Sequence, residues 1–119
     1  MTFIWAAGSP QRLSRKATSA LRRSSTDLEI SAISLAEIAV KHGRGKLGLR
    51  RDDVQTAITE LNLRVLSWAS DHALRLFTLP FQHGDPLDRM IIAQALAEDL
   101  PIVTPDPAFI LYAGLKTIW

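Results

Sequence analysis

The sequence predicts one α/β domain built around a mostly parallel β-sheet. Amphipathic helical segments alternate along the chain with short apolar segments rich in β-branched residues, as in folds whose parallel strands are joined by crossover helices. The chain has 119 residues, of which 47% are hydrophobic and 22% charged, a composition typical of a globular domain. It contains no internal repeat and no low-complexity tract, so we expect a single domain over residues 1–119.

The first half of the chain contains two helical segments separated by a strand. A serine N-cap begins a helix over residues 14–24, where leucines and alanines recur at helical spacing. The sequence LEISAI, residues 28–33, then has the apolar, β-branched character of a short buried strand. Ser34 and Glu37 follow as the capping-box pattern Ser-x-x-Glu, which opens a second helix over residues 35–42.

The second half continues this alternation. The pattern predicts a helix over residues 51–62, a strand over 63–67, a helix over 70–80, a helix from Pro86 to about Asp99, and strands over 102–104 and 115–119. Pro86 suits the first helical position behind Asp85, because the backbone N–H at that position has no partner within the helix.

The composition excludes several classes of protein. The chain has no cysteine, so it forms neither disulfides nor thiolate metal sites. No run approaches the 18 or so apolar residues that a membrane span needs, and the N-terminus lacks the pattern of a secretory signal. We therefore expect a cytoplasmic protein.

Charge is divided unevenly along the chain. Residues 1–51 hold ten of the 14 Lys and Arg and only three acids, a formal charge of +7, whereas residues 52–119 carry −5. Basic clusters can bind phosphates. Solvated surface faces explain the same clusters equally well, so charge alone does not establish nucleic-acid binding.

Three acids are expected at one edge of the sheet. In a right-handed βαβ unit each helix begins at the C-terminal edge of the preceding strand, and ligand sites lie at that edge. Glu37 lies in the first turn of its predicted helix, Asp88 in the first turn of the helix before strand 102–104, and Asp106 just after that strand. Asp88 shares a helical face with Ile91 and Ile92, so its side chain should point toward the sheet. The three carboxylates should therefore converge.

Simpler roles account for each acid taken alone. Glu37 and Asp88 occupy the third position of their predicted helices, where acids commonly cap free N–H groups, and Asp106 lies in the turn-like TPDP. Together, however, three carboxylates would repel one another unless a cation lay between them. Oxygen ligands without Cys or His clusters favour Mg²⁺ or Mn²⁺ over Zn²⁺.

Three stretches together resemble the PIN-domain ribonucleases, in particular the VapC-type toxins of bacterial toxin–antitoxin pairs. They are ISLAEIAVKHGRGKLGL (33–49), HGDPLDRMIIAQALAEDLPIVTPDPAF (83–109) and the closing LKTIW. The resemblance implies a three-layer α/β/α fold, an Mg²⁺- or Mn²⁺-dependent endoribonuclease, a cognate antitoxin and a homodimer.

The resemblance also assigns individual residues. Glu37, Asp88 and Asp106 match three of the family's four metal-site acids, Thr104 matches a hydroxyl residue before the last acid, and Asp85 matches an accessory acid. Candidates for binding RNA phosphates, each with an ordinary surface role as the alternative, are Lys41, Arg44, Lys46 and Arg89.

The sequence departs from the family pattern at its N-terminus. Family members usually begin with an apolar strand that ends in Asp-Thr-His or a similar triplet, whereas here Met1-Thr2 leads directly into a segment like the following helix. We therefore expect the first strand and its metal-binding Asp to be absent, with Phe3, Ile4 and Trp5 on a helix face. Either the recorded start is internal to a longer natural chain, which we favour, or the domain is truncated.

Two further hypotheses remain open at this point. The missing aspartate favours a catalytically impaired module that binds antitoxin or RNA without turnover. A purely structural domain would instead use its acids as independent caps and turns. His42 and His83 are expected to be loop residues rather than ligands.

Overall fold

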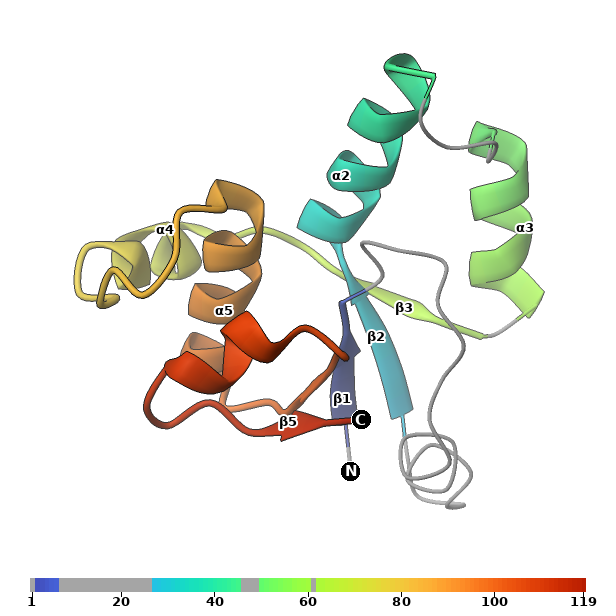
Figure 1. Cartoon of the computed structure of the whole chain (residues 1–119). Helices are drawn as coiled ribbons and strands as arrows, with labels where there is room; N and C mark the ends of the chain where they lie inside the picture. Colours follow the sequence, from blue (N-terminus) through green and yellow to red (C-terminus); the bar gives the residue numbers. More distant parts are fainter. Residues whose placement is uncertain (1, 7–26, 46–49, 61) are drawn as a thin grey trace.

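The computed structural model describes residues 2–6, 27–45, 50–60 and 62–119. Its strands are β1 (Thr2–Trp5), β2 (Asp27–Ser31), β3 (Arg64–Leu66), β4 (Ile102–Val103) and β5 (Thr117–Ile118). They form one sheet in the order β3-β2-β1-β4-β5, and every neighbouring pair is parallel. This sheet confirms the predicted α/β fold class (Figure 1).

Helices lie on both sides of the sheet. They are α2 (Ala32–Gly43), α3 (Arg51–Glu60), α4 (Ser70–Leu76), α5 (Pro86–Glu98) and the short 3-10 helix η1 (Pro107–Leu111). Figure 1 shows α4 and α5 on one side and α3 on the other, with α2 beyond the end of β2. The helix predicted over residues 14–24 lies outside the described residues. None of the described helices is long and apolar enough to cross a membrane.

The central strand is the largest departure from the predicted fold. Thr2–Trp5 forms β1, which lies between β2 and β4 and pairs in parallel with both. Phe3 and Ile4 are buried in separate apolar clusters on opposite faces of the sheet. The prediction that the first strand is absent and that these residues form a helix face is therefore wrong. A short run of aromatic and β-branched residues suits a buried strand, and its pairing covers edges that β2 and β4 would otherwise expose.

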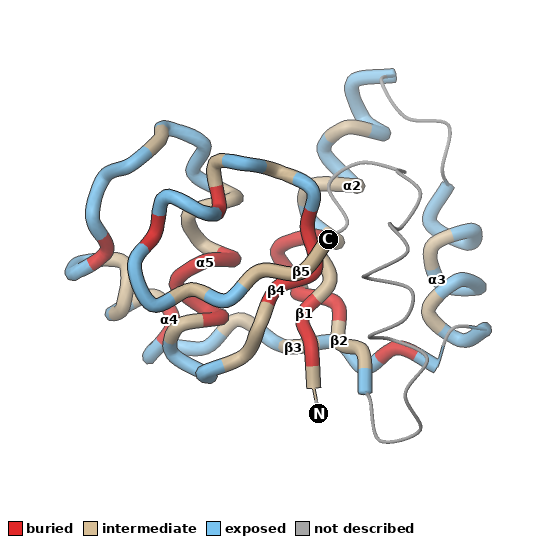
Figure 2. Tube along the Cα trace, turned by 60° about the horizontal axis from the view of Figure 1, so that its bottom comes forward, coloured by how far each residue is buried: buried red, intermediate tan, exposed pale blue. Residues whose placement is uncertain are grey.

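Helix α5 packs against one face of the sheet and holds the core together. Its residues Ile91 and Ile92 are fully buried and pack in one cluster with Ile4 of β1 and Ile102 of β4. Figure 2 shows that buried segments concentrate in α5, β1 and β4. Because its apolar face packs against the strands in this way, the N-terminal turn of α5 lies at a fixed place on the sheet edge.

Helix α2 begins one turn earlier than the sequence predicts. Ser31 ends β2 with an extended backbone, and its side-chain oxygen accepts a hydrogen bond from the backbone N–H of Ile33 at 3.1 Å. Ser31, not Ser34, is therefore the N-cap, and Glu37 lies in the second turn rather than the first. The predicted capping box is wrong because Ser31 supplies an earlier cap at the strand end.

The cap is part of a buried polar network. Ser31 donates a hydrogen bond of 2.6 Å to Oε1 of Gln94, and the amide nitrogen of Gln94 donates to the Ser67 carbonyl at 3.1 Å. Both side chains are fully buried. By contrast, Ser34 is buried with no hydrogen-bond partner for its hydroxyl among the described residues.

Replacing the two buried serines should affect stability differently. Ser31→Ala removes the cap and leaves Gln94 without its donor, so we expect the free energy of unfolding to fall by about 2 kcal/mol. Ser34→Ala removes a hydroxyl that has no partner among the described residues, so we expect no loss, or a small gain. Urea denaturation of both variants and the unmodified chain measures the difference. Equal losses in the two variants would contradict the assignment of Ser31 as the cap.

Candidate metal centre

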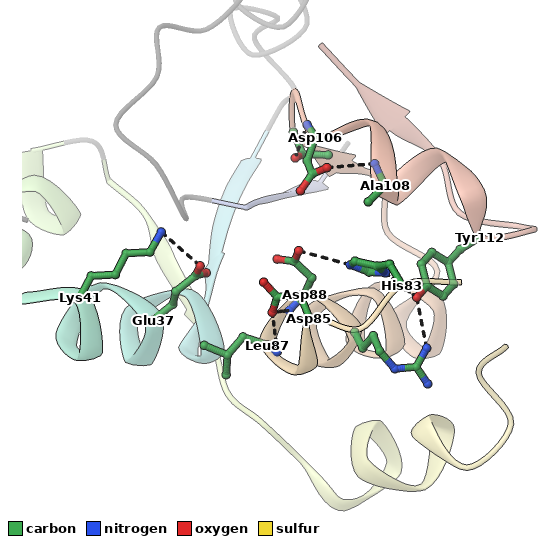
Figure 3. A network of polar contacts seen from close by, with 11 residues as sticks. Glu37, Lys41, His83, Asp85, Leu87, Asp88, Asp106, Ala108 and Tyr112 are labelled. Atoms are coloured by element: carbon green, nitrogen blue, oxygen red, sulfur yellow. Dashed lines mark hydrogen bonds and ion pairs between the residues drawn. The ribbon is translucent and has the colours of Figure 1, made fainter. Parts of the chain in front are cut away.

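The acids identified in the sequence lie at the C-terminal edge of the sheet. Glu37 lies on α2, Asp85 and Asp88 at the N-terminus of α5, and Asp106 after β4. Figure 3 shows the carboxylates of Glu37, Asp88 and Asp106 directed toward a common region. The structure thus brings together acids from three separate segments.

Two acids stand at the start of α5. Asp85 is the N-cap, and its Oδ1 accepts hydrogen bonds from the backbone N–H groups of Leu87 and Asp88 at 3.0 and 3.1 Å. Pro86 occupies the first helical turn, as predicted. Asp85 therefore already has a capping role, whereas the side chain of Asp88 is free of that role and extends toward the other acids.

The charge of Asp88 is strongly disfavoured by its surroundings. Burial, with only 15% of its side chain exposed, is the largest cause, and the negative charges of Asp85, Glu37 and Asp106 add to it. A hydrogen bond with His83 acts in the opposite direction. Together these effects raise the pKa of Asp88 from 3.8 to about 6. The site therefore accumulates negative charge that a bound cation would stabilise.

Glu37 lies beside a basic side chain of the same helix. Its side chain is 13% exposed, and Oε1 lies 3.4 Å from Nζ of Lys41, one turn further along α2. This pair partly offsets the negative charge at the edge of the site, and it places a positive group beside the acids.

Asp106 and Thr104 shape the turn after β4. Oδ1 of Asp106 caps η1 by accepting the N–H of Ala108 at 2.9 Å. The hydroxyl of Thr104 accepts the N–H of Asp106 at 3.2 Å, which orients the turn. The predicted turn role of Asp106 is thus present, and Figure 3 shows its carboxylate still facing the side of Asp88.

The arrangement suits a cation that keeps several of its waters better than one coordinated entirely by protein ligands. Within the described ranges, Glu37, Asp88 and Asp106 do not form a group whose ligand atoms all lie within 4.8 Å. Magnesium commonly binds through one or two carboxylates and keeps several waters. The oxygen-only donor set and the raised pKa of Asp88 therefore fit such an ion without direct contact from every acid.

A second cluster, between α4 and the C-terminal end of α5, fits a metal less well. Asp71, His72 and Glu98 bring their ligand atoms within 4.8 Å. Nδ1 of His72 accepts the backbone N–H of Ala69 at 3.0 Å, so in the neutral ring Nε2 carries the proton and donates it to Glu98 at 2.7 Å. Metal binding at Nε2 would displace that proton to Nδ1 and break the bond from Ala69. These contacts therefore assign the buried His72 a hydrogen-bonding role between Ala69 and Glu98.

The candidate phosphate-binding residues differ in their surroundings. Arg44 is exposed just after α2, and Lys46 lies outside the described residues. Arg89, however, donates to the Pro80 carbonyl at 2.8 Å and to the Tyr112 hydroxyl at 3.1 Å, with its guanidinium 4.9 Å from the Phe81 ring centroid. These contacts give Arg89 a structural role, and its binding of phosphate stays a prediction.

Sequence reasoning missed the contact between His83 and Asp88. His83 was expected to be an ordinary loop residue, yet Nε2 lies 3.3 Å from Oδ2 of Asp88 and Nδ1 lies 2.7 Å from the Tyr112 hydroxyl. His83 lies in the loop before α5, five residues before Asp88, and the sequence does not predict the conformation of that loop. Tyr112 is distant in sequence, so no local pattern indicated it.

The centre has no acid from the central strand. β1 ends at Trp5, and Ala6 continues its pairing by donating to the Val103 carbonyl at 3.1 Å. The first acid of the sequence is Asp27, at the opposite end of β2 from the site. The strand is therefore present, and the sequence has no acid at its end.

Together, the parallel sheet and the acids at its C-terminal edge define an α/β protein with a carboxylate-rich candidate metal centre. The family model described as PIN domain matches residues 2–115. The chain belongs to the PIN domain family, which confirms the resemblance found in the sequence.

Several solved structures share this fold. A chain of VapBC2 from Rickettsia felis, bound to a DNA fragment from its promoter, has a TM-score of 0.72 and 18% identity, covering 98% of this chain and 97% of that one. FitAcB from Neisseria gonorrhoeae gives 0.63 and 19%, covering 98% and 96%. DNA-bound VapBC from Salmonella typhimurium gives 0.61 and 16%, covering 98% and 97%. At these identities the likeness shows the fold alone. No curated protein matches the sequence.

The stability of the metal-free protein should depend on the charge of Asp88. The pKa of Asp88 is 3.8 in its ordinary state and about 6 in the folded protein. Between these two pH values the folded protein keeps the Asp88 proton, whereas the unfolded chain releases it. The free energy of unfolding therefore falls as the pH rises from 3.8 to about 6. Asp88→Asn removes that charge, so it should raise the free energy of unfolding by about 1–2 kcal/mol at about pH 8 and change it little at about pH 4.

Urea denaturation in the presence of EDTA at both pH values measures this effect. Asp99→Asn is a matched control, because Asp99 is exposed at the other end of α5 with a positive φ of 53° that asparagine also tolerates. A stabilisation by Asp88→Asn that is equal at both pH values would contradict the assigned electrostatics.

Proposed function

We propose that this protein is a VapC-type toxin, a metal-dependent endoribonuclease that cleaves RNA phosphodiester bonds and is neutralised by a cognate antitoxin. The observation that carries the proposal is the half-buried Asp88, its pKa raised in part by Glu37 and Asp106 from two other segments of a PIN fold. We further propose that the protein acts in the cytoplasm and that it forms a homodimer.

In the proposed hydrolysis, each acid of the candidate metal centre has a separate role. Asp88 would hold Mg²⁺ or Mn²⁺, with Glu37 and Asp106 beside it, because these carboxylates face one region. When bound, such an ion lowers the pKa of a water ligand and stabilises charge that develops on a phosphodiester. Glu37 or Asp106 would orient the attacking water and accept its proton. Asp85 and Thr104 act as accessory groups that hold the α5 N-terminus and the β4 turn.

Positive residues beside α2 would hold the RNA backbone. Lys41 lies next to Glu37, and Arg44 is exposed just beyond the helix end. Lys46 follows them in the sequence, and positive side chains of this kind supply the phosphate contacts that position a substrate.

The antitoxin is proposed to bind in the hollow between α2 and α3. This hollow has a volume of about 310 Å³ and is lined by Leu35, Ile38, Val54 and Ile58, with Arg50 and Arg51 among the lining residues. No residue of α3 is buried, so its apolar side chains lack a tightly packed partner within the described chain. A segment with apolar and acidic side chains would complement both the lining and the arginines. A structure described as a toxin–antitoxin complex from Klebsiella pneumoniae shares this fold with a TM-score of 0.57, which supports a protein partner.

A specific observation favours a second candidate function. No acid stands at the end of β1, where the family resemblance expects one of four metal-site residues. A centre with one fewer carboxylate would bind a cation more weakly, so the protein would then act as a non-catalytic module that binds antitoxin or RNA.

Cleavage of a mixed RNA pool distinguishes the two functions. We expect cutting in Mg²⁺ or Mn²⁺ that EDTA abolishes and that Asp88→Asn reduces by at least about 100-fold, because this residue holds the ion. Asp99→Asn should retain full activity. Absence of cutting by a folded, metal-supplied chain would reject the endoribonuclease and favour the binding module.

The proposed antitoxin surface has its own test. Val54→Glu places a negative charge in the apolar hollow, so it should weaken binding of the cognate antitoxin by at least about tenfold while leaving RNA cleavage unchanged. Thr56→Glu, an exposed position on the same helix outside the lining residues, is the matched control. Isothermal titration calorimetry with purified antitoxin measures both. Undiminished binding by Val54→Glu would place the antitoxin elsewhere.

A further inference from the structure

A chain of hydrogen bonds leads from the backbone behind the site to the carboxylate of Asp88. Arg89 Nη1 lies 3.1 Å from the Tyr112 hydroxyl, which lies 2.7 Å from His83 Nδ1, while His83 Nε2 lies 3.3 Å from Asp88 Oδ2. Figure 3 shows His83 between Tyr112 and Asp88. Tyr112 is only 2% exposed, so this chain is sheltered from water along its inner part.

The chemistry of the four groups gives the chain a single direction. A guanidinium has donors and no acceptor, so Arg89 donates to the oxygen of Tyr112. In the arrangement that also lets His83 donate to Asp88, and so lower the pKa of that carboxyl, the Tyr112 hydroxyl donates its proton to His83 Nδ1. In the neutral imidazole the ring proton is therefore on Nε2, from which it is donated to the carboxylate of Asp88.

The far end of the chain is fixed by contacts that do not involve the site. Arg89 also donates to the Pro80 carbonyl at 2.8 Å, and its guanidinium lies over the Phe81 ring. The rings of His83 and Tyr112 meet edge to face with centroids 5.5 Å apart and an interplanar angle of 71°. Neither Arg89 nor Tyr112 can turn away without losing these contacts, so the orientation of His83 is restrained from behind.

We infer that His83 is a positioning residue for Asp88: Tyr112 holds it in the Nε2–H tautomer, and the ring then holds one carboxylate oxygen of Asp88 in place. The inference rests on the proposed metal centre. Groups that hydrogen-bond to metal-binding side chains orient them, and their loss typically weakens metal binding by 10- to 100-fold. A carboxylate often orients a metal-binding histidine through a hydrogen bond. Here the histidine, His83, would orient the carboxylate of Asp88 in the same way.

The tautomer can be measured directly, without activity. In the metal-free, full-length protein labelled with ¹⁵N-histidine, long-range ¹H–¹⁵N correlation at about pH 8 should show His83 protonated at Nε2 and not at Nδ1. In Tyr112→Phe the preference should weaken, because the donor to Nδ1 is gone. A ring protonated at Nδ1 alone, or at both nitrogens, in the unmodified protein would overturn the inference.

Metal affinity tests whether the orientation matters. Isothermal titration with Mn²⁺ should show about tenfold weaker binding in His83→Asn, whose shorter amide cannot replace Nε2, and a smaller loss in His83→Gln, whose amide nitrogen can donate at nearly the same place. Tyr112→Phe should fall between these variants and the unmodified chain. His42→Gln, at an exposed histidine of α2, is the control and should bind as the unmodified chain does.

The outcomes separate this inference from the proposed function. Equal Mn²⁺ affinity in folded His83→Asn, His83→Gln and the unmodified protein would overturn the positioning role, as would the absence of Mn²⁺ binding by the unmodified protein. Failure to cleave RNA while the tautomer and the graded Mn²⁺ affinities follow expectation would reject only the endoribonuclease.

Discussion

The repulsion among carboxylates at one sheet edge is the constraint on which the rest of the site depends. A parallel sheet directs the ends of its strands and the starts of its helices to the same edge, so acids that are far apart in sequence meet there. The ionised form of Asp88 is the most disfavoured, because this side chain is also buried, and its pKa rises to about 6. Two neighbouring contacts reduce this repulsion: Lys41 pairs with Glu37, and His83 donates to Asp88.

Rigid packing keeps these acids from moving apart to relieve the repulsion. Helix α5 is clamped by Ile91 and Ile92 against the strands, and α2 is tied to α5 through Ser31 and Gln94. The two elements that bear Glu37 and Asp88 are therefore held relative to each other by buried contacts. If the candidate centre binds a cation, this packing would hold its carboxylates in place beforehand.

Much of the fold and the location of the site followed from sequence patterns that are local. Alternation of helical and strand periodicity gave the α/β class, and the Asp85-Pro86 pair gave the start of α5. Wrong predictions arose where two local solutions compete. Ser31 and Ser34 are both suitable caps, and the choice depends on Gln94, which lies 63 residues away. Likewise, TFIW suits a helix face or a strand, and only pairing with β2 and β4 decides between them.

The sequence by itself determined the fold class, the acids and the edge at which they gather, because periodicity and residue chemistry act over short distances. Only the tertiary structure decided which groups surround Asp88. The contacts of His83 with Tyr112, and of Arg89 with the Pro80 carbonyl, join segments whose approach depends on how α5, η1 and the loop between α4 and α5 pack. Directional hydrogen bonds need atoms placed to within a few tenths of an ångström, and that placement is a property of the assembled core.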